Sequence, residues 1–345
     1  MNLMTKKHEQ SILSDLRVGI LFNSPVMPSK GETVDYVADA EVEDEVEAVE
    51  KALQRLDLEY ARFPLKDDIA SLIDSLKDYN MGVVINLCEA AFGESRLEMA
   101  VPSMLELLRI PYTGSSSLAL GLCQNKGLTK TILNAKGILT PEYQVLNKFE
   151  DWHDEISYPL FVKPLNEDGS IGITKKSFVE DERALKTQVE YIIERYRQSA
   201  LVEKYIAGRE LNVAILGNEK TRILPISEII FEFSHEPKIV DYSAKWFKDS
   251  EEYKKTIPMC PAKLDLSTKA LIEREALKTY AVLYCRDYVR VDMRLNGQVP
   301  YVIEVNPNPD ISPDGGYARS LKAAGISYEE FLREIICSAL KRKVS

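Results

Sequence analysis

Two runs of alternating polar and apolar residues lie close together in the segment 289–307. The polar members are Arg290, Asp292 and Arg294 in the first run, and Glu304 and Asn306 in the second. Because successive side chains of a strand point to opposite faces, this period of two predicts two strands that each have one polar face. The Asn296-Gly297 pair between the runs is a strong hairpin signal. The segment therefore predicts an antiparallel hairpin.

The length of the loop decides whether the two polar faces meet. A two-residue loop at Asn296-Gly297 would turn the polar sides of the strands to opposite faces of the hairpin. A three-residue loop, 296–298, pairs Leu295 with Val299 and places Arg290 opposite Glu304 on the same side. We predict the three-residue loop, since it gathers four polar residues on one surface: Arg290, Asp292, Glu304 and Asn306.

Two carboxylates and an amide on this surface, Asp292, Glu304 and Asn306, form a set of hard oxygen donors. Mg²⁺ prefers such donors and often enters enzymes together with nucleotide phosphates. The same spacing also fits a surface ladder of opposite charges, in which cross-strand pairs stabilise the sheet. The spacing leaves both interpretations open.

The remainder of the chain has the pattern of an α/β protein followed by an α+β region. Residues 18–23 and 82–87 read as buried strands, residues 42–56 carry one apolar helical stripe, and a helix is expected over about 96–109. From residue 113 onward, strand-like runs at hairpin spacing predict antiparallel sheets. We expect an N-terminal extension (1–16), a small parallel α/β domain (17–112) and a larger α+β domain (113–340), the latter divided into subdomains at about 120–205 and 206–340.

Composition excludes several classes of protein. The 345 residues carry a formal net charge of −10, which argues against a nucleic-acid platform with a basic face. No stretch reaches the roughly 18 apolar residues of a membrane helix, and the first 16 residues lack the apolar core of a secretory signal. Five widely spaced cysteines without a CxxC pattern suggest reduced thiols in a cytoplasmic protein. With only three histidines, far apart in sequence, a histidine-rich zinc site or a Ser-His-Asp triad is not expected.

Two further segments have the residue types of a nucleotide site. Lys163 ends a predicted strand before a loop that contains Gly169, Ser170 and Gly172, and backbone N–H groups in such loops cradle phosphates. The alternative is an ordinary turn, since neither GxxxxGK[ST] nor GxGxxG occurs. The second segment, 202–210, contains Glu203 and Glu210 around a turn, which suits either an adenine and ribose site or a plain hairpin.

Taken together and in order, these segments resemble the ATP-grasp superfamily, and specifically its D-alanine–D-alanine ligase branch. The matching stretches are 110–115, Asn125-Lys126 with Thr129-Lys130, 161–164, 202–210, 241–245, 290–295 and 303–307. They extend over most of residues 80–330, so they are far more specific than any single match. The resemblance implies that ATP is clamped between two antiparallel sheets, behind a small N-terminal α/β domain.

The resemblance also implies roles for individual residues. ATP is expected to contact Lys126, Lys163, Gly169, Ser170, Glu203, Ile206 and Glu210. Asp292, Glu304 and Asn306 resemble the ligands of two Mg²⁺ ions, with Mn²⁺ as a substitute. Arg290, Ser170 and Lys245 are the expected catalytic residues, and Arg290 would stabilise negative charge at the reacting centre. The implied reaction is ATP-dependent carboxylate–amine ligation through an acyl phosphate, on amino acids or small peptides.

The sequence departs from the family at the substrate end. Trp246 stands where the family has a tyrosine, Asp310 where it has a glycine, and Gly315 where it has a serine that holds the acceptor carboxylate. The family's glutamate for the substrate ammonium group matches either Glu41 or Glu45, although acidic residues here also suit the first turn of a solvated helix. We therefore expect a ligase with a different substrate pair; the alternatives are D-alanine–D-alanine ligation and, less expected, a non-catalytic ATP-binding regulator. The family's habit suggests a homodimer.

Overall fold

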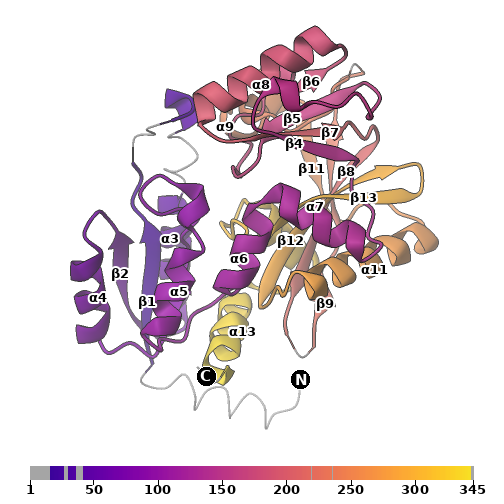
Figure 1. Ribbon diagram of the computed structural model, residues 1–345. Coiled ribbons are helices and arrows are strands. Elements are labelled where there is room, and N and C mark those ends of the chain that lie inside the picture. Colours follow the sequence, from indigo (N-terminus) through magenta and orange to yellow (C-terminus); the bar gives the residue numbers. More distant parts are fainter. Residues whose placement is uncertain (1–15, 27–29, 36–41, 219, 235, 343–345) are drawn as a thin grey trace.

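The computed structural model describes residues 16–26, 30–35, 42–218, 220–234 and 236–342, and within them three sheets follow one another along the chain (Figure 1). The first is parallel, with the order β2-β1-β3. Its strands are β1 (Arg17–Asn23), β2 (Glu59–Leu65) and β3 (Val83–Asn86), and its helices are α3 (Val42–Arg55), α4 (Ile69–Asp78) and α5 (Ala100–Leu107). Apolar residues of α3 and of the carboxyl-terminal helix α13 (Tyr328–Lys341) share one core with this sheet. The last helix is thus packed onto the first domain.

The second sheet is antiparallel, with the order β4-β7-β5-β6. Its strands are β4 (Tyr143–Leu146), β5 (Leu160–Pro164), β6 (Phe178–Val179) and β7 (Ala200–Lys204). Helix α8 (Glu182–Tyr196) buries Leu185, Val189 and Ile192 against it. Helices α6 (Ser117–Gln124) and α7 (Lys126–Ala135) precede this sheet in the chain.

The third and largest sheet has the order β11-β10-β8-β12-β13, with β9 paired to β8. Its strands are β8 (Arg209–Leu216), β9 (Arg222–Ile223), β10 (Ser227–Phe231), β11 (Thr256–Met259), β12 (Tyr288–Asn296) and β13 (Val299–Asn306). The helices of this region are α9 (Tyr242–Trp246), α10 (Glu251–Lys254), α11 (Leu266–Val282) and α12 (Gly316–Ala323). The parallel sheet followed by two antiparallel sheets confirms the predicted fold class, whereas the exact domain boundaries stay a prediction.

The β12–β13 hairpin corrects the predicted register. Pairing continues to Asn296 opposite Val299, so the loop has two residues, Gly297 and Gln298, and the predicted three-residue loop is wrong. With that loop alone, Asp292 would lie opposite Ile303 and the polar faces would diverge. A β-bulge supplies one extra residue on β13, because Met293 pairs with Val302 while Asp292 pairs with Glu304. The polar residues therefore meet through the bulge and not through the loop.

Three smaller expectations also need correction. The helix expected over 96–109 is a 3₁₀ turn, η2 (Ser95–Leu97), followed by the shorter α5. Residues 222–230, one of the strand-like runs expected after residue 113, form parts of two strands, β9 and β10, and Pro225 lies between them. Strand β2 was not expected at all, since Pro64 and a mixture of charged and apolar residues conceal its period.

The segment between β1 and α3 reaches across to the second sheet. Its short helix η1 (Thr33–Asp35) lies beside α8 (Figure 1). Glu32 forms an ion pair with Arg195 at 3.0 Å, and the Tyr196 hydroxyl donates a hydrogen bond to Asp35 at 3.3 Å. This contact ties the first domain to α8. None of the helices in the described parts of the chain is long and apolar enough to cross a membrane.

Candidate functional site

Lys126 connects the helical region to the third sheet. The Asn125 side chain accepts a hydrogen bond from the Leu128 N–H and so caps α7, which puts Lys126 at the first position of the helix. The buried Lys126 Nζ lies 2.9 Å from Glu304 Oε1 on β13 and 2.8 Å from Asp168 Oδ1 in the loop after β5. Burial disfavours the ammonium, but the two carboxylates outweigh it and raise the pKa of Lys126. A permanent positive charge is thus held at the junction of the two antiparallel sheets.

Glu203 on β7 lies between two buried lysines. Its Oε1 is 2.9 Å from Lys163 Nζ on β5, and its Oε2 is 2.7 Å from Lys130 Nζ, one turn after Lys126 on α7. Burial opposes the ionised carboxylate, yet both lysines together lower the pKa of Glu203. Burial, helped by the charge of Lys163, lowers the pKa of Lys130 to about 8. Glu203 therefore fixes two cations in place, and its expected contact with the nucleotide base stays a prediction.

Arg290, Asp292 and Asn306 form a network on the polar face of the hairpin. The Arg290 guanidinium donates to both oxygens of Asp292 at 2.8 and 2.9 Å. Asn306 and the neighbouring Asn212 also donate to Asp292, at 3.0 and 2.7 Å. Burial disfavours the charge on Arg290, but Asp292 outweighs it and raises the pKa of Arg290 further. The side chains that the sequence predicted to share one surface are in contact.

The donor set of Asp292, Glu304 and Asn306 fits a divalent cation that arrives with phosphate. Burial favours a protonated Glu304, but Lys126 and Lys163 outweigh it and lower its pKa to about 2, so the carboxylate is ionised at neutral pH. Two carboxylates and an amide leave further ligand positions for phosphate oxygens and water, as is usual for Mg²⁺. Among the described residues, no three acidic, histidine or cysteine side chains converge on a metal position by themselves.

The remaining residues predicted to contact the nucleotide are Ile206, in the link between β7 and β8, and Glu210, near the start of β8. Ile206 is half-buried in this link, and Glu210 pairs with the buried Arg294 at 2.9 Å. Burial raises the pKa of Glu210, which Arg294 only partly offsets. These two residues lie where the chain passes from the second sheet to the third, so both sheets can contact one ligand from this side.

The loop after β5 packs against α9. Gly169 and Ser170 both have φ near +63°, and the Ser170 hydroxyl donates to the Val240 carbonyl at 2.9 Å. The Trp246 indole N–H donates to the Gly169 carbonyl at 2.9 Å, and Lys245 Nζ lies 4.5 Å from the centre of the Trp246 ring. Although tryptophan replaces the family's tyrosine, the side chain at this position holds the loop after β5 through the Gly169 carbonyl.

The predicted substrate residues of the N-terminal and C-terminal parts come together. Glu45 on α3 is buried, and its Oε1 accepts a hydrogen bond from the Ile311 N–H at 2.8 Å. Burial, with Asp310 and Glu89 nearby, raises the pKa of Glu45 well above its usual value. Such a carboxylate gains from a cationic partner. The other candidate, Glu41, lies outside the described residues.

Gly315 and Asp310 pack tightly against each other. A Cβ at Gly315 would lie 2.6 Å from Asp310 Oδ2 and 3.0 Å from the Ser312 carbonyl. A serine, which the family has here, would therefore require the Asp310 carboxylate to move aside. The two departures from the family pattern depend on one another.

Sequence reasoning assigned no role to four residues of this site. They are Asp168, Asn212, Arg294 and Arg319. The first precedes Gly169 directly, and the next two share strands with predicted residues, so strand periodicity offered a signal for them. Arg319 offered no such signal, because the first turn of α12 brings it toward Arg290. Arg319 Nη2 and Arg290 Cδ lie 3.6 and 4.0 Å from the position that a Cβ of Gly316 would occupy.

Comparisons with known proteins agree with this geometry. Residues 122–337 match the family model described as the D-ala D-ala ligase C-terminus. A D-alanine–D-alanine ligase of Thermotoga petrophila is 34% identical to this chain, and the match covers 85% of this chain and 90% of the ligase. An uncharacterized protein of Sinorhizobium fredii is 37% identical, and that match covers 76% of this chain and 75% of the relative. The crystal structure of a D-alanine–D-alanine ligase from Bacillus anthracis has a TM-score of 0.77 and 28% identity, covering 94% of this chain and 98% of that one. A structure of that ligase complexed with ATP has a TM-score of 0.73 and 26% identity over the same shares.

The relatives match along nearly the whole fold, and the matched stretch contains both the two-sheet junction and the hairpin of Arg290 and Glu304. The chain therefore belongs to the D-alanine–D-alanine ligase family of ATP-grasp enzymes, and it is an ATP-dependent ligase that forms an amide bond and releases ADP and phosphate.

Proposed function

We propose that this enzyme joins the carboxylate of one amino acid or small peptide to the amine of another through an acyl phosphate. One observation carries the proposal. Lys126, Glu304 and Asp168 are locked together where the two antiparallel sheets meet, and Arg290 and Asp292 lie on the same hairpin as Glu304. Fixed cations beside ionised oxygen donors are what phosphoryl transfer requires.

In the first step, a carboxylate oxygen of the substrate attacks the γ-phosphorus of ATP. The bond between that phosphorus and the β,γ-bridging oxygen breaks, so the products are an acyl phosphate and ADP. Lys126 and Lys163 offset charge on the phosphates, and Arg290 offsets charge on the carboxylate. Asp292, Glu304 and Asn306 are the proposed ligands of two Mg²⁺ ions, with Mn²⁺ as a substitute, which would neutralise negative charge on the phosphates.

In the second step, the amine of the other substrate attacks the acyl carbon. The carbon–oxygen bond to phosphate breaks, phosphate leaves, and the amine loses a proton as the amide forms. Arg290 and the backbone N–H of Asp310 are the proposed donors to the oxyanion. Water must be excluded, because it would hydrolyse the acyl phosphate. The loop at Gly169 and Ser170, held by Trp246, supplies this cover, and Lys245 lies beside it.

We propose that the substrate pair differs from two D-alanines. The support is the rewritten substrate end, where Gly315 replaces the family's serine and the Asp310 carboxylate fills the space beside it. Without that hydroxyl, a buried acceptor carboxylate loses a hydrogen bond worth about 1–3 kcal/mol. Glu45 is the proposed partner of the substrate ammonium group, since its buried carboxylate lies next to Asp310.

The test is ADP release with Mg-ATP across a panel of D- and L-amino acids, singly and in pairs, with the product mass read in parallel. The proposal predicts ADP release that depends on a pair other than D-alanine with itself, together with one amide product. Ligation of D-alanine to D-alanine as the best pair would overturn the proposed substrate difference. ADP release without any amide product would overturn ligation itself.

We further propose that the enzyme works in the cytoplasm as a homodimer. None of the five cysteines forms a disulfide and four of them are buried, as is usual in a reducing compartment. The homodimer rests on the family resemblance alone. The oligomeric state is tested by light scattering from the purified chain, with and without ATP. A homodimer predicts a molar mass near twice 39.1 kDa.

A further inference from the structure

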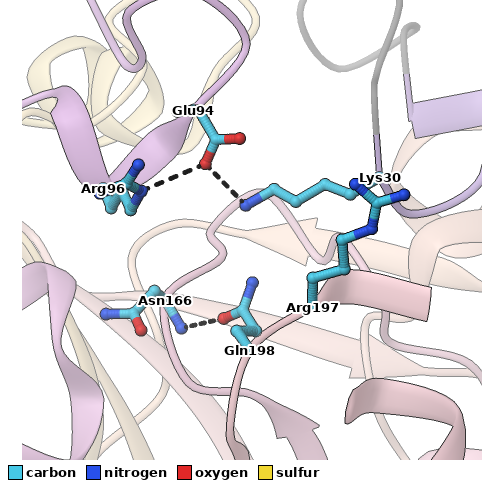
Figure 2. A pocket seen from close by; sticks show the side chains of 6 residues that line it. All are labelled: Lys30, Glu94, Arg96, Asn166, Arg197 and Gln198. Atoms are coloured by element: carbon cyan, nitrogen blue, oxygen red, sulfur yellow. Dashed lines mark hydrogen bonds and ion pairs between the residues drawn. The ribbon is translucent and has the colours of Figure 1, made fainter. Parts of the chain in front are cut away.

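A polar cavity lies between the first domain and the second sheet (Figure 2). Its volume is about 310 Å³, at the lower end of small-molecule sites. All the residues that line it are polar or charged: Lys30, Glu94, Arg96, Asn166, Arg197 and Gln198. They come from the segments after β1 and β3, the loop after β5, and the connection from α8 to β7. None of them belongs to the ATP and metal set described above.

The lining carries more positive than negative charge. Three cations face the carboxylate of Glu94, whose Oε2 is shared between Lys30 at 3.1 Å and Arg96 at 3.4 Å (Figure 2). Lys30 also pairs at 2.9 Å with Glu167 behind the lining, which leaves one cation in excess. The chain as a whole carries a net charge of −10, so this local excess of cations is not a property of the surface in general. An anionic group would complete the charge balance of the cavity.

Arg197 is the cation with no partner in the described parts of the chain. It ends α8 with a φ of +53°, in the left-handed region where glycine is usual. Its side chain extends toward Lys30 across the cavity (Figure 2). The next residue, Gln198, is held in place by its side chain, since the Asn166 N–H donates to Gln198 Oε1 at 2.7 Å and Gln198 Nε2 donates to Glu167 at 2.7 Å. Arg197 is exposed, so its guanidinium can bind a ligand at the rim of the cavity, and it has no acceptor within the described residues.

The cavity connects to the phosphate loop through Glu167. The buried Glu167 carboxylate lies 2.9 Å from Lys30 Nζ and accepts a hydrogen bond from the Ser95 hydroxyl at 2.7 Å. The next residue, Asp168, pairs with Lys126, and Gly169 follows. A smaller cavity of about 30 Å³ also touches Lys30 and extends to Glu167 and Ile171 of the loop. A group bound beside Lys30 is thus next to the loop that covers the reacting phosphate.

We propose that this cavity binds a second carboxylate of the substrate, so that the enzyme takes an acidic amino acid or a peptide that carries one. The inference rests on the proposed ligase function, which makes amino acids the substrates. A carboxylate suits the cavity better than a phosphate, because Glu94 in the wall repels a dianion more strongly than a single negative charge. Arg197 and Arg96 offer the planar donor pairs that carboxylates accept.

The experiment compares substrates that differ only in this charge. The kcat/KM for ADP release is measured with each acid and its amide, aspartate against asparagine and glutamate against glutamine, in both D and L forms and with each amine partner. The wild type is expected to prefer one acid over its amide by at least about tenfold. In Arg197→Gln this preference falls to near one, whereas Arg183→Gln, an exposed arginine at the start of α8 outside the cavity, keeps the wild-type ratio. No preference in the wild type, or an unchanged preference in Arg197→Gln, contradicts the proposal.

A binding measurement separates this proposal from the ligase function. Glutarate, a dicarboxylate without an amine, is titrated by calorimetry into the wild type, Arg197→Gln and Arg183→Gln in the absence of ATP. Binding that Arg197→Gln weakens at least about tenfold and Arg183→Gln leaves intact supports the site even where no pair is ligated. Ligation of neutral pairs only, without glutarate binding, leaves the ligase function standing and overturns the carboxylate site.

Discussion

Lys126 and Glu304 form an ion pair of 2.9 Å that joins the first residue of α7 to β13, although 178 positions separate them in the chain. The pair lies at the junction of the second and third sheets, and Asp168 joins it from the phosphate loop. Three segments that contact different parts of ATP in our proposal therefore share one charged cluster. Changes at this cluster are expected to affect turnover more than folding.

Glu304→Gln tests the proposed metal ligand. The substitution keeps the size of the side chain but removes the negative charge that Lys126 and a cation share. Mg²⁺-dependent ADP release is expected to fall at least about 100-fold. Glu334→Gln is the matched control, because Glu334 pairs with Arg222 in a partly exposed ion pair and neither residue belongs to the site. Turnover in Glu304→Gln equal to that of the control would defeat the metal assignment.

Trp246→Phe tests the cover over the phosphates. The change removes the indole N–H that donates to the Gly169 carbonyl and keeps an aromatic ring against the loop. A looser loop admits water, so the fraction of ATP hydrolysed without amide formation is expected to rise several-fold. The ratio of ADP to amide product measures this uncoupling. The control is Trp152→Phe, at the other tryptophan of the chain, which packs against the core between the second sheet and α8. This variant should leave the ratio unchanged.

The tight packing of Gly315 on Asp310 predicts a dependence between two substitutions. Gly315→Ser alone brings its Cβ within 2.6 Å of Asp310 Oδ2, so we expect a loss of about 1–3 kcal/mol in the free energy of unfolding. Asp310→Gly with Gly315→Ser removes the clash and should recover most of that stability. Urea unfolding of the two variants measures the difference. Equal stability losses in both would mean that Asp310 does not occupy the space in question.

Asp35 gives a pH dependence of stability. Burial raises its pKa to about 6, above the usual value of 3.8, despite hydrogen bonds from the Glu32 N–H and Tyr196. Because the folded pKa is the higher one, the stabilising contribution of Asp35 is present below pH 3.8 and is lost as the pH rises through 6. Asp35→Asn is thus expected to raise the melting temperature at pH 8, and the gain should shrink between pH 6 and pH 4. Asp78→Asn, an exposed aspartate at the end of α4, should show no such trend.

The sequence predicted the fold class and most of the nucleotide site, because strand periodicity and ordered motifs depend on nearby residues. It predicted the shared polar face of the hairpin for the wrong reason. The bulge at Ile303 has no local signature, since nothing in its neighbours distinguishes a bulged strand from a regular one. Strand β2 was missed because its exposed and buried residues do not alternate cleanly.

The part of the site that sequence could not predict depends on long-range burial. Glu203 serves two lysines because α7 packs beside β5 and β7, a relationship that no spacing reveals. The polar cavity around Lys30 and Arg197 joins segments that are more than 160 positions apart. Such sites require the packing of whole domains, and only the structure shows them.

The central claim is ligation through an acyl phosphate, and the fate of the carboxylate oxygens tests it most directly. The donor substrate found in the amino-acid panel is labelled with the heavy oxygen isotope in its carboxylate, and the phosphate released with Mg-ATP is analysed by mass spectrometry. Attack of that carboxylate on the γ-phosphorus predicts one labelled oxygen in each phosphate released with an amide product. Unlabelled phosphate alongside the same amide product would contradict the account.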